Sequence, residues 1–194
     1  MKKNFFLVFA ACLMFSTASF SQIQQGNLLV GGNIADFNLG LEDGTPFQMQ
    51  ISPKIGYFVK DNFAVGAYLN LGLVSGGGTT IFNYGVGPLA RYYFSGKENI
   101  TPLRHSRLFA EANLGIEGAN VSGGGGSTNG LGLGIGPGFA YFITPNVGLE
   151  ALLKYNGLVG FGDETTQSNL NFSVGFQIYL PTKSLRARLA NDAK

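Results

Sequence analysis

The chain has 194 residues, of which 45% are hydrophobic and 12% charged, and it contains 30 glycines and one cysteine. This length corresponds to one domain, and a formal net charge of +2 offers no basic surplus of the kind that nucleic-acid-binding proteins carry. Abundant glycine, few charges and no polar low-complexity tract favour a β-rich membrane protein over a disordered chain.

The N-terminal residues have the three parts of a secretory signal peptide. Lys2 and Lys3 are basic, residues 5–15 are apolar, and residues 16–21 are mostly small or polar, so we expect cleavage after residue 21. The apolar part is too short for a membrane-spanning helix, and no later apolar run reaches the roughly 18 residues that such a helix needs. Without Lys2 and Lys3 the mature chain has 11 basic residues (13 minus 2) against 11 acidic ones.

The single cysteine, Cys12, lies in the apolar part of this segment. Acylation of Cys12 would make the chain a lipoprotein, but Phe9 stands where a lipobox prefers leucine or a smaller aliphatic residue. We therefore favour an ordinary signal peptide. Its removal leaves no thiol for a disulfide or a cysteine metal site.

Eight later segments alternate apolar and polar side chains at every second position, which predicts eight β-strands. The predicted strands are residues 26–38, 46–60, 63–73, 79–94, 107–120, 131–141, 147–156 and 168–180. Most are at least as long as the ~9–11 residues with which a tilted strand crosses a bilayer. The first is the least regular, and its pattern slips near Asp36, which indicates a β-bulge.

Short turns alternate with longer loops between these strands, as in transmembrane barrels. With the N-terminus on the periplasmic side, the turns at 60–62 and 144–146 and the connection 95–106 lie there as well, and the loops near 40–45, 75–79, 121–129 and 162–168 face outward. Aromatic residues are expected to form interfacial girdles at both ends. The periplasmic girdle would contain Tyr57, Tyr92, Phe94, Tyr141 and Tyr179, and the outer one Phe47, Phe82 and Tyr155.

The same alternation occurs in soluble lipocalin-type barrels, in which the apolar face points inward. Here the polar face mixes glycine with Asn, Gln and Tyr and lacks the charged cover of a water-soluble sheet, so we favour apolar side chains that point into lipid. Six strand charges would then lie in the lumen: Lys54, Arg91, Glu111, Glu117, Glu150 and Lys154.

These six charges balance, which suggests that they pair inside the barrel. We expect Arg91 to pair with Glu111 and Glu150, with Lys54 adjoining, and Lys154 to pair with Glu117 nearer the outer end. Such a network would fill the lumen; the alternative is that some of the charges meet lumen water. The glycine row of segment 131–141 is expected to accommodate bulky inward groups, for example Arg91, Tyr68 or Phe109.

Little in the sequence points to catalysis or to a cofactor. The only histidine, His105, lies in a polar connection and is interpreted as an exposed turn residue. The run GLGLGIGPG has Pro137 where a dinucleotide-binding fingerprint needs its third glycine, so it is interpreted as a glycine-lined strand face. We therefore predict no catalytic residue, no metal site and no cofactor.

Two charged regions outside the strands remain open to interpretation. Acidic residues of the outer loops (Glu42, Asp43, Asp163 and Glu164) could bind divalent cations that bridge lipopolysaccharide, but solvated loops are the simpler account. Residues 181–194 form a short basic periplasmic tail, which could touch peptidoglycan or headgroups or be merely solvated.

The last strand resembles the C-terminal β-signal of bacterial outer-membrane proteins, in which a polar residue and a glycine precede two apolar residues. The corresponding residues are Ser173, Gly175, Ile178 and Leu180. Leu180 stands where that family usually has an aromatic residue, and fourteen residues follow it. The resemblance implies recognition by the barrel-assembly machinery.

Residues 22–180 as a whole resemble the eight-stranded outer-membrane barrel families of the OmpA-barrel, OmpX and OmpW-like type. The SFSQ sequence, the GYFVKDNFAVG hairpin and the GPLARYYF strand are similar to the "porin family" of Bacteroidetes. The resemblance implies an all-β, eight-stranded, antiparallel, up-and-down transmembrane β-barrel in contact with outer-membrane lipid and lipopolysaccharide. A structural or surface-interaction role is expected, with a narrow channel for small solutes as the alternative. The resemblance does not identify an external ligand.

Overall fold

The computed structural model describes residues 23–38, 46–94, 105–122, 127–161 and 166–182. The expected signal peptide and its cleavage site, the acidic loop residues and residues 183–194 of the basic tail lie outside these residues, whereas Pro181, predicted as the start of that tail, is the last residue of the final strand. The described part contains no helix that is long and apolar enough to cross a membrane.

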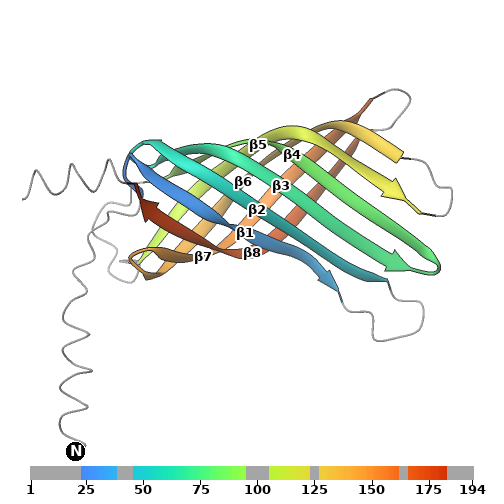
Figure 1. Ribbon diagram of the computed structural model, residues 1–194, viewed down its shortest axis with the longest axis horizontal. Helices are drawn as coiled ribbons and strands as arrows, with labels where there is room; N and C mark the ends of the chain where they lie inside the picture. Colours follow the sequence, from blue (N-terminus) through green and yellow to red (C-terminus); the bar gives the residue numbers. More distant parts are fainter. Residues whose placement is uncertain (1–22, 39–45, 95–104, 123–126, 162–165, 183–194) are drawn as a thin grey trace, which may run out of the picture.

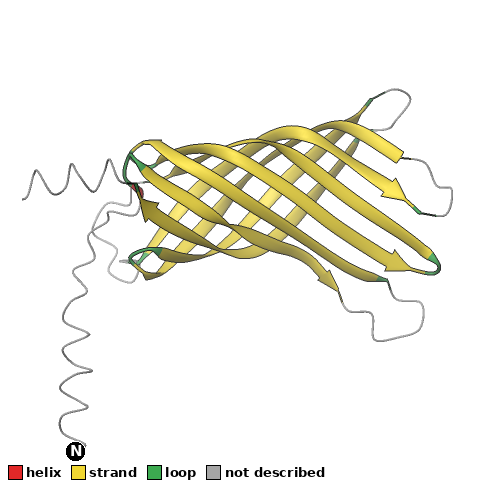
Figure 2. Cartoon of the chain, viewed as in Figure 1, coloured by secondary structure: helices red, strands yellow, loops and turns green. Residues whose placement is uncertain are grey.

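Eight antiparallel strands form a closed barrel in which each strand pairs with its neighbours in sequence and β8 closes against β1 (Figures 1 and 2). The strands are β1 (Asn27–Asn38), β2 (Phe47–Lys60), β3 (Phe63–Gly76), β4 (Thr79–Tyr93), β5 (Ser106–Val121), β6 (Ser127–Thr144), β7 (Val147–Gly160) and β8 (Gln167–Pro181). The predicted fold class, strand number and order are confirmed.

Strand boundaries differ from the predicted ones mainly in β3, β6 and β7, at the end of the barrel away from the start of β1. β6 begins at Ser127 rather than Leu131, because residues 127–130 continue the ladder with residues 117–120 of β5. Backbone hydrogen bonds extend a strand past the point where its apolar alternation stops. The expected bulge in β1 is confirmed: its pairing with β2 shifts between Ala35 and Asn38.

Three tight turns join neighbouring strands in the described part of the chain, at residues 61–62, 77–78 and 145–146, and the first two use residues that tolerate a positive φ. Asn62, with φ 65°, lies between β2 and β3, and asparagine is one of the few side chains that visit the left-handed region readily. Gly77 and Gly78, with φ 59° and 81°, link β3 to β4 as a two-residue hairpin. Positive φ at both central residues is the requirement of the type I′ turn, which matches the twist of paired strands.

The apolar rows of the strands point outward, and the polar rows point into the barrel. Ile55, Val86 and Leu108 are each more than half exposed, and the alternate positions of β6 from Leu131 to Ile143 are all exposed. Lys54, Arg91 and Glu111, by contrast, are buried inside the barrel. A soluble barrel would have the reverse arrangement, so the molecule has the surface of a transmembrane barrel.

Aromatic side chains lie at both ends of this apolar surface. Tyr57, Tyr92, Phe94 and Tyr141 are exposed near the end at which β1 begins, as expected, and Phe82 and Tyr155 are exposed toward the other end, where Phe47 is half-buried. The expectation for Tyr179 is wrong, because its side chain is fully buried. Tyr179 lies two residues from the buried Gln177, on the same face of β8, and therefore points into the lumen.

Candidate functional site: the barrel lumen

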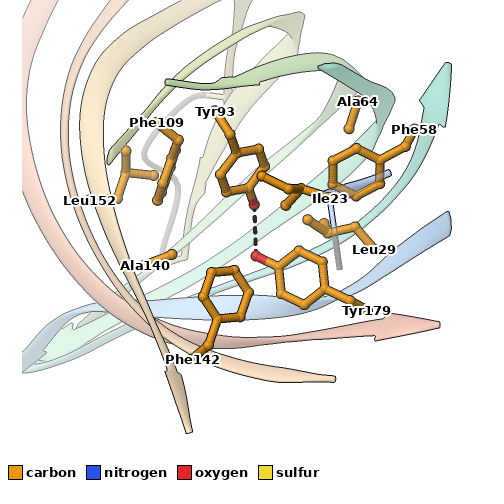
Figure 3. Packing of buried hydrophobic residues seen from close by; sticks show 10 residues of the cluster. All are labelled: Ile23, Leu29, Phe58, Ala64, Tyr93, Phe109, Ala140, Phe142, Leu152 and Tyr179. Atoms are coloured by element: carbon orange, nitrogen blue, oxygen red, sulfur yellow. Dashed lines mark hydrogen bonds between the residues drawn. The ribbon is translucent and has the colours of Figure 1, made fainter. Parts of the chain in front are cut away.

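A layer of apolar and aromatic side chains fills the lumen near the end at which β1 begins (Figure 3). It consists of Ile23, Leu29, Phe58, Ala64, Tyr93, Phe109, Ala140, Phe142, Leu152 and Tyr179. The hydroxyl groups of Tyr93 and Tyr179 are 2.7 Å apart and hydrogen-bonded, and the rings of Phe142 and Tyr179 lie 5.2 Å apart between centroids. This layer closes the lumen at the end that we expect to be periplasmic.

Ile23 reaches this layer from outside the strands. It precedes β1, is buried, and its carbonyl accepts a hydrogen bond from the Asn62 amide at 2.8 Å. Its place in the lumen was missed by the sequence analysis, which began the barrel at residue 22 without giving the first residues a role. No alternating segment contains Ile23, so the sequence pattern offered no signal for it.

Next to this layer, Arg91 and Glu111 form the centre of a buried ion network. They are direct partners in the β4–β5 ladder, and Arg91 Nε donates to Glu111 Oε2 at 3.0 Å. Arg91 Nη1 donates to Glu150 Oε1 at 2.6 Å, and Lys54 Nζ lies 2.9 Å from both oxygens of Glu111. The structure therefore brings together the four residues that were expected to pair at this level.

The expected pair of Lys154 and Glu117 is wrong. Lys154 Nζ donates instead to Glu111 Oε1 at 2.7 Å and to Asn113 Oδ1 at 2.9 Å. Glu117 Oε1 accepts hydrogen bonds from Tyr68 Oη at 3.0 Å and from Asn70 Nδ2 at 3.5 Å.

The stagger of the strands explains this difference. Glu111 pairs with Gly136, and a β-carbon built on Gly136 would come within 2.7 Å of the Lys154 α-carbon. Lys154 thus lies in the row of Glu111, with only a glycine between them. Glu117 pairs with Gly130, six residues away along β6. In a closed barrel, the shear sets how far each strand is displaced along its neighbour. The predicted pairs were based on distances from the strand ends, which do not include this displacement.

Glycines make room for the large side chains of the lumen. A β-carbon on Gly138 of β6 would lie 2.2 Å from Phe109 Cζ, so the ring occupies the place of the missing side chain. The Arg91 guanidinium carbon lies 4.2 Å from the centroid of the same ring, within the range of a cation–π contact. Tyr68 makes its corresponding contact with Gly115 of β5. The role expected for the glycine row of β6 thus holds for Phe109.

On the other side of the ion network from the aromatic layer lies a polar cavity of about 40 Å³. It is lined by Asn33, Ala35, Gln50, Ser52, Lys54, Asn70, Leu152, Lys154, Asn156, Asn171 and Ser173. Among the described buried groups, the amides of Asn33 and Gln177 and one carboxylate oxygen of Glu150 have no hydrogen-bond partner. These amides were not among the predicted site residues, because nothing in a period-2 pattern distinguishes a bonded amide from an unbonded one.

The residues of the expected assembly signal lie along the seam between β8 and β1. Ser173, Gly175, Ile178 and Leu180 pair with Ala35, Asn33, Val30 and Leu28. A β-carbon on Gly175 would lie 2.1 Å from the Gly32 carbonyl oxygen, so only glycine fits here. The geometry gives this glycine a part in closing the barrel.

No group of three or more His, Cys, Asp or Glu side chains in the described part of the chain could hold a metal ion. His105 is exposed, and its carbonyl accepts a backbone hydrogen bond from Phe142 at 2.6 Å. The lumen side chains described above are buried, and their ion pairs join β2, β4, β5 and β7 from inside the barrel.

Comparison with known proteins supports the fold and goes no further. No family model matches the sequence, and no curated protein matches it significantly. Among solved structures, Neisserial surface protein A is 22% identical with a TM-score of 0.55, over 78% of this chain and 94% of its own. The N-terminal β-barrel domain of OprF from Pseudomonas aeruginosa is 19% identical with a TM-score of 0.54, over 80% and 98%. The chain shares the architecture of these eight-stranded barrels.

Proposed function

We propose that the protein is an integral outer-membrane β-barrel with a closed lumen, which serves as a structural element or as a scaffold for surface interaction. The fold and the outward apolar surface support the placement in a membrane. A secretory signal peptide, as expected from the sequence, would deliver the chain to the periplasm for insertion. The barrel-assembly machinery, outer-membrane lipid and lipopolysaccharide are its proposed partners.

One observation carries the closed-lumen part of this proposal: the side chains that cross the lumen are almost completely buried. Side chains that point into an open, water-filled lumen would be exposed. Four that point into this lumen are each at most 1% exposed: Arg91, Glu111, Tyr93 and Tyr179. Interior-facing side chains fill barrels of about eight strands rather than leaving a channel. A role that depends on flow through the barrel is therefore the less favoured one.

A narrow channel for small solutes is the second candidate. The polar cavity beside Lys54 and Lys154 favours it, because a cavity lined by amides and hydroxyls could form one half of a path. Such a path would have to open through the ion network and the aromatic layer.

Planar-bilayer recording of the refolded, purified protein separates the two candidates. A closed barrel gives no stable conductance in 1 M salt, whereas a channel gives discrete, repeated steps. If the recording shows no steps, deletion of the outer loops followed by binding of labelled variants to whole cells tests the surface role. Unchanged binding by barrels without the outer loops would exclude the surface role, and the structural role would be the remaining candidate.

A further inference from the structure

The buried ion network carries an excess positive charge. Lys54, Arg91 and Lys154 contribute three positive charges against the two negative charges of Glu111 and Glu150, and their side chains are at most 17% exposed. Glu117 is not part of this network, since its carboxylate is hydrogen-bonded to Tyr68 and Asn70. An uncompensated charge in a poorly solvated interior is costly, so a further negative group nearby would be stabilising.

The polar cavity adjoins this excess charge. Both lysines line it, and none of its eleven lining residues is an aspartate or a glutamate. Its other polar residues are amides and hydroxyls, which can donate hydrogen bonds. The electrostatic character of the cavity is therefore positive.

Two groups at this cavity have donor capacity to spare. Lys154 Nζ carries three N–H groups, and two acceptors are in place, Glu111 Oε1 and Asn113 Oδ1. Asn33 borders the cavity, is only 4% exposed, and has no partner for either atom of its amide. Buried amides in native proteins are nearly always hydrogen-bonded, so an unpartnered one at a cavity indicates a bound group.

We propose that this cavity binds one small inorganic anion of halide size, held by the ammonium groups of Lys54 and Lys154 and by the Asn33 amide. Water alone would satisfy the amide but would not compensate the charge. A volume of about 40 Å³ suits a particle of the size of a water molecule or a halide ion. The anion is a structural ligand that stabilises the folded barrel.

Bromide is the probe that tests this site. Crystals of the folded full-length barrel grown in sodium bromide should show an anomalous peak in contact with Lys154 Nζ and the Asn33 amide. The peak should be lost in Lys154→Met, in which the network is neutral, and kept in Lys60→Met, which removes an exposed lysine of β2. Asn33→Ala is the second variant, and it should weaken the peak if Lys154→Met does not fold.

Thermal unfolding in detergent gives an independent readout. The apparent Tm of the wild type and of Lys60→Met should be higher in chloride than in gluconate at equal ionic strength, and that of Lys154→Met should be the same in both. Absence of an anomalous peak at this cavity in the wild type, or a bromide peak that persists unchanged in Lys154→Met and Asn33→Ala as an adventitious ion only, would overturn the proposal. So would equal Tm values of the wild type in the two salts.

Discussion

Arg91 and Glu111 stand directly opposite each other on β4 and β5, and Glu111 also receives the ammonium groups of Lys54 and Lys154. One carboxylate thus joins side chains from four strands, β2, β4, β5 and β7. The Glu111 carboxylate therefore links these four strands through ion pairs inside the barrel.

Replacing Glu111 by glutamine should therefore destabilise the barrel strongly. The change leaves three cations in a buried site with one carboxylate, and breaking a buried ion pair costs about 3–5 kcal/mol. We expect that loss of unfolding free energy in urea titrations of the protein refolded into lipid vesicles.

Glu117→Gln is the matched control. Glu117 is half-buried on the same strand and accepts hydrogen bonds from uncharged groups, for which the expected loss is about 1 kcal/mol. Equal losses for the two variants would show that Glu111 does not hold the network together.

Gly138→Ala should destabilise the barrel through Phe109. A β-carbon at Gly138 would lie 2.2 Å from the ring, and overpacking of this kind costs about 1–3 kcal/mol. Gly148→Ala, also inward-facing, should be tolerated, because its β-carbon would meet Phe142 and Tyr179 at an ordinary 3.5 Å.

The combination of Gly138→Ala with Phe109→Leu tests the mechanism. In a double-mutant cycle of unfolding free energies, the smaller side chain should relieve part of the clash, so the two effects should not add. Strict additivity would mean that the ring does not fill the space above Gly138.

Gly175→Ala should impair closure of the barrel. The nearest atom to the added β-carbon is the Gly32 carbonyl oxygen, at 2.1 Å, and backbone of a paired strand cannot turn aside as a side chain can. We expect a smaller folded fraction, seen as loss of the compact band that shifts on boiling in gel electrophoresis. Gly56→Ala serves as the control, because its nearest contact would be 3.6 Å. Equal folded fractions for both variants would remove the special role of Gly175 at the seam.

Thinning the aromatic layer should open the lumen only in part. Phe58, Tyr93 and Tyr179 pack with ring centroids 5.9 to 6.4 Å apart. Their joint replacement by alanine removes the layer but leaves the ion network. In bilayer recordings we expect small, flickering currents from this variant and larger ones when Arg91→Ala is added. If the wild type already conducts steadily, the closed-lumen account is wrong.

The period-2 pattern predicted the eight strands, and the composition of their polar rows predicted that these rows face the lumen. It failed where position depends on how strands are offset from one another. Lys154 binds Glu111 rather than Glu117 because neighbouring strands are displaced along one another. The sequence pattern of a single strand contains no information on that displacement. Tyr179 was placed in the girdle because it lies at a strand end, although its parity with Gln177 already put it inside.

Other parts of the lumen depend on contacts between residues far apart in the chain. Ile23 lies outside every alternating segment, so its insertion into the lumen left no mark in the pattern. The unpartnered amides of Asn33 and Gln177 are visible only once the neighbouring strands, with Gly175 and Gly31 beside them, are in place.

The most direct test of the account is a nitroxide scan along β8 in lipid vesicles, on mature protein in which the label is the only thiol derivative. Oxygen, which concentrates in lipid, and a water-soluble nickel complex report which side each label faces. Labels at Phe172, Val174 and Phe176 should collide with oxygen, and labels at Asn171, Ser173 and Gln177 should be shielded from it. Oxygen accessibility should therefore alternate with a period of two residues along β8. High nickel accessibility at the first three positions, with oxygen contact at the other three, would contradict the account.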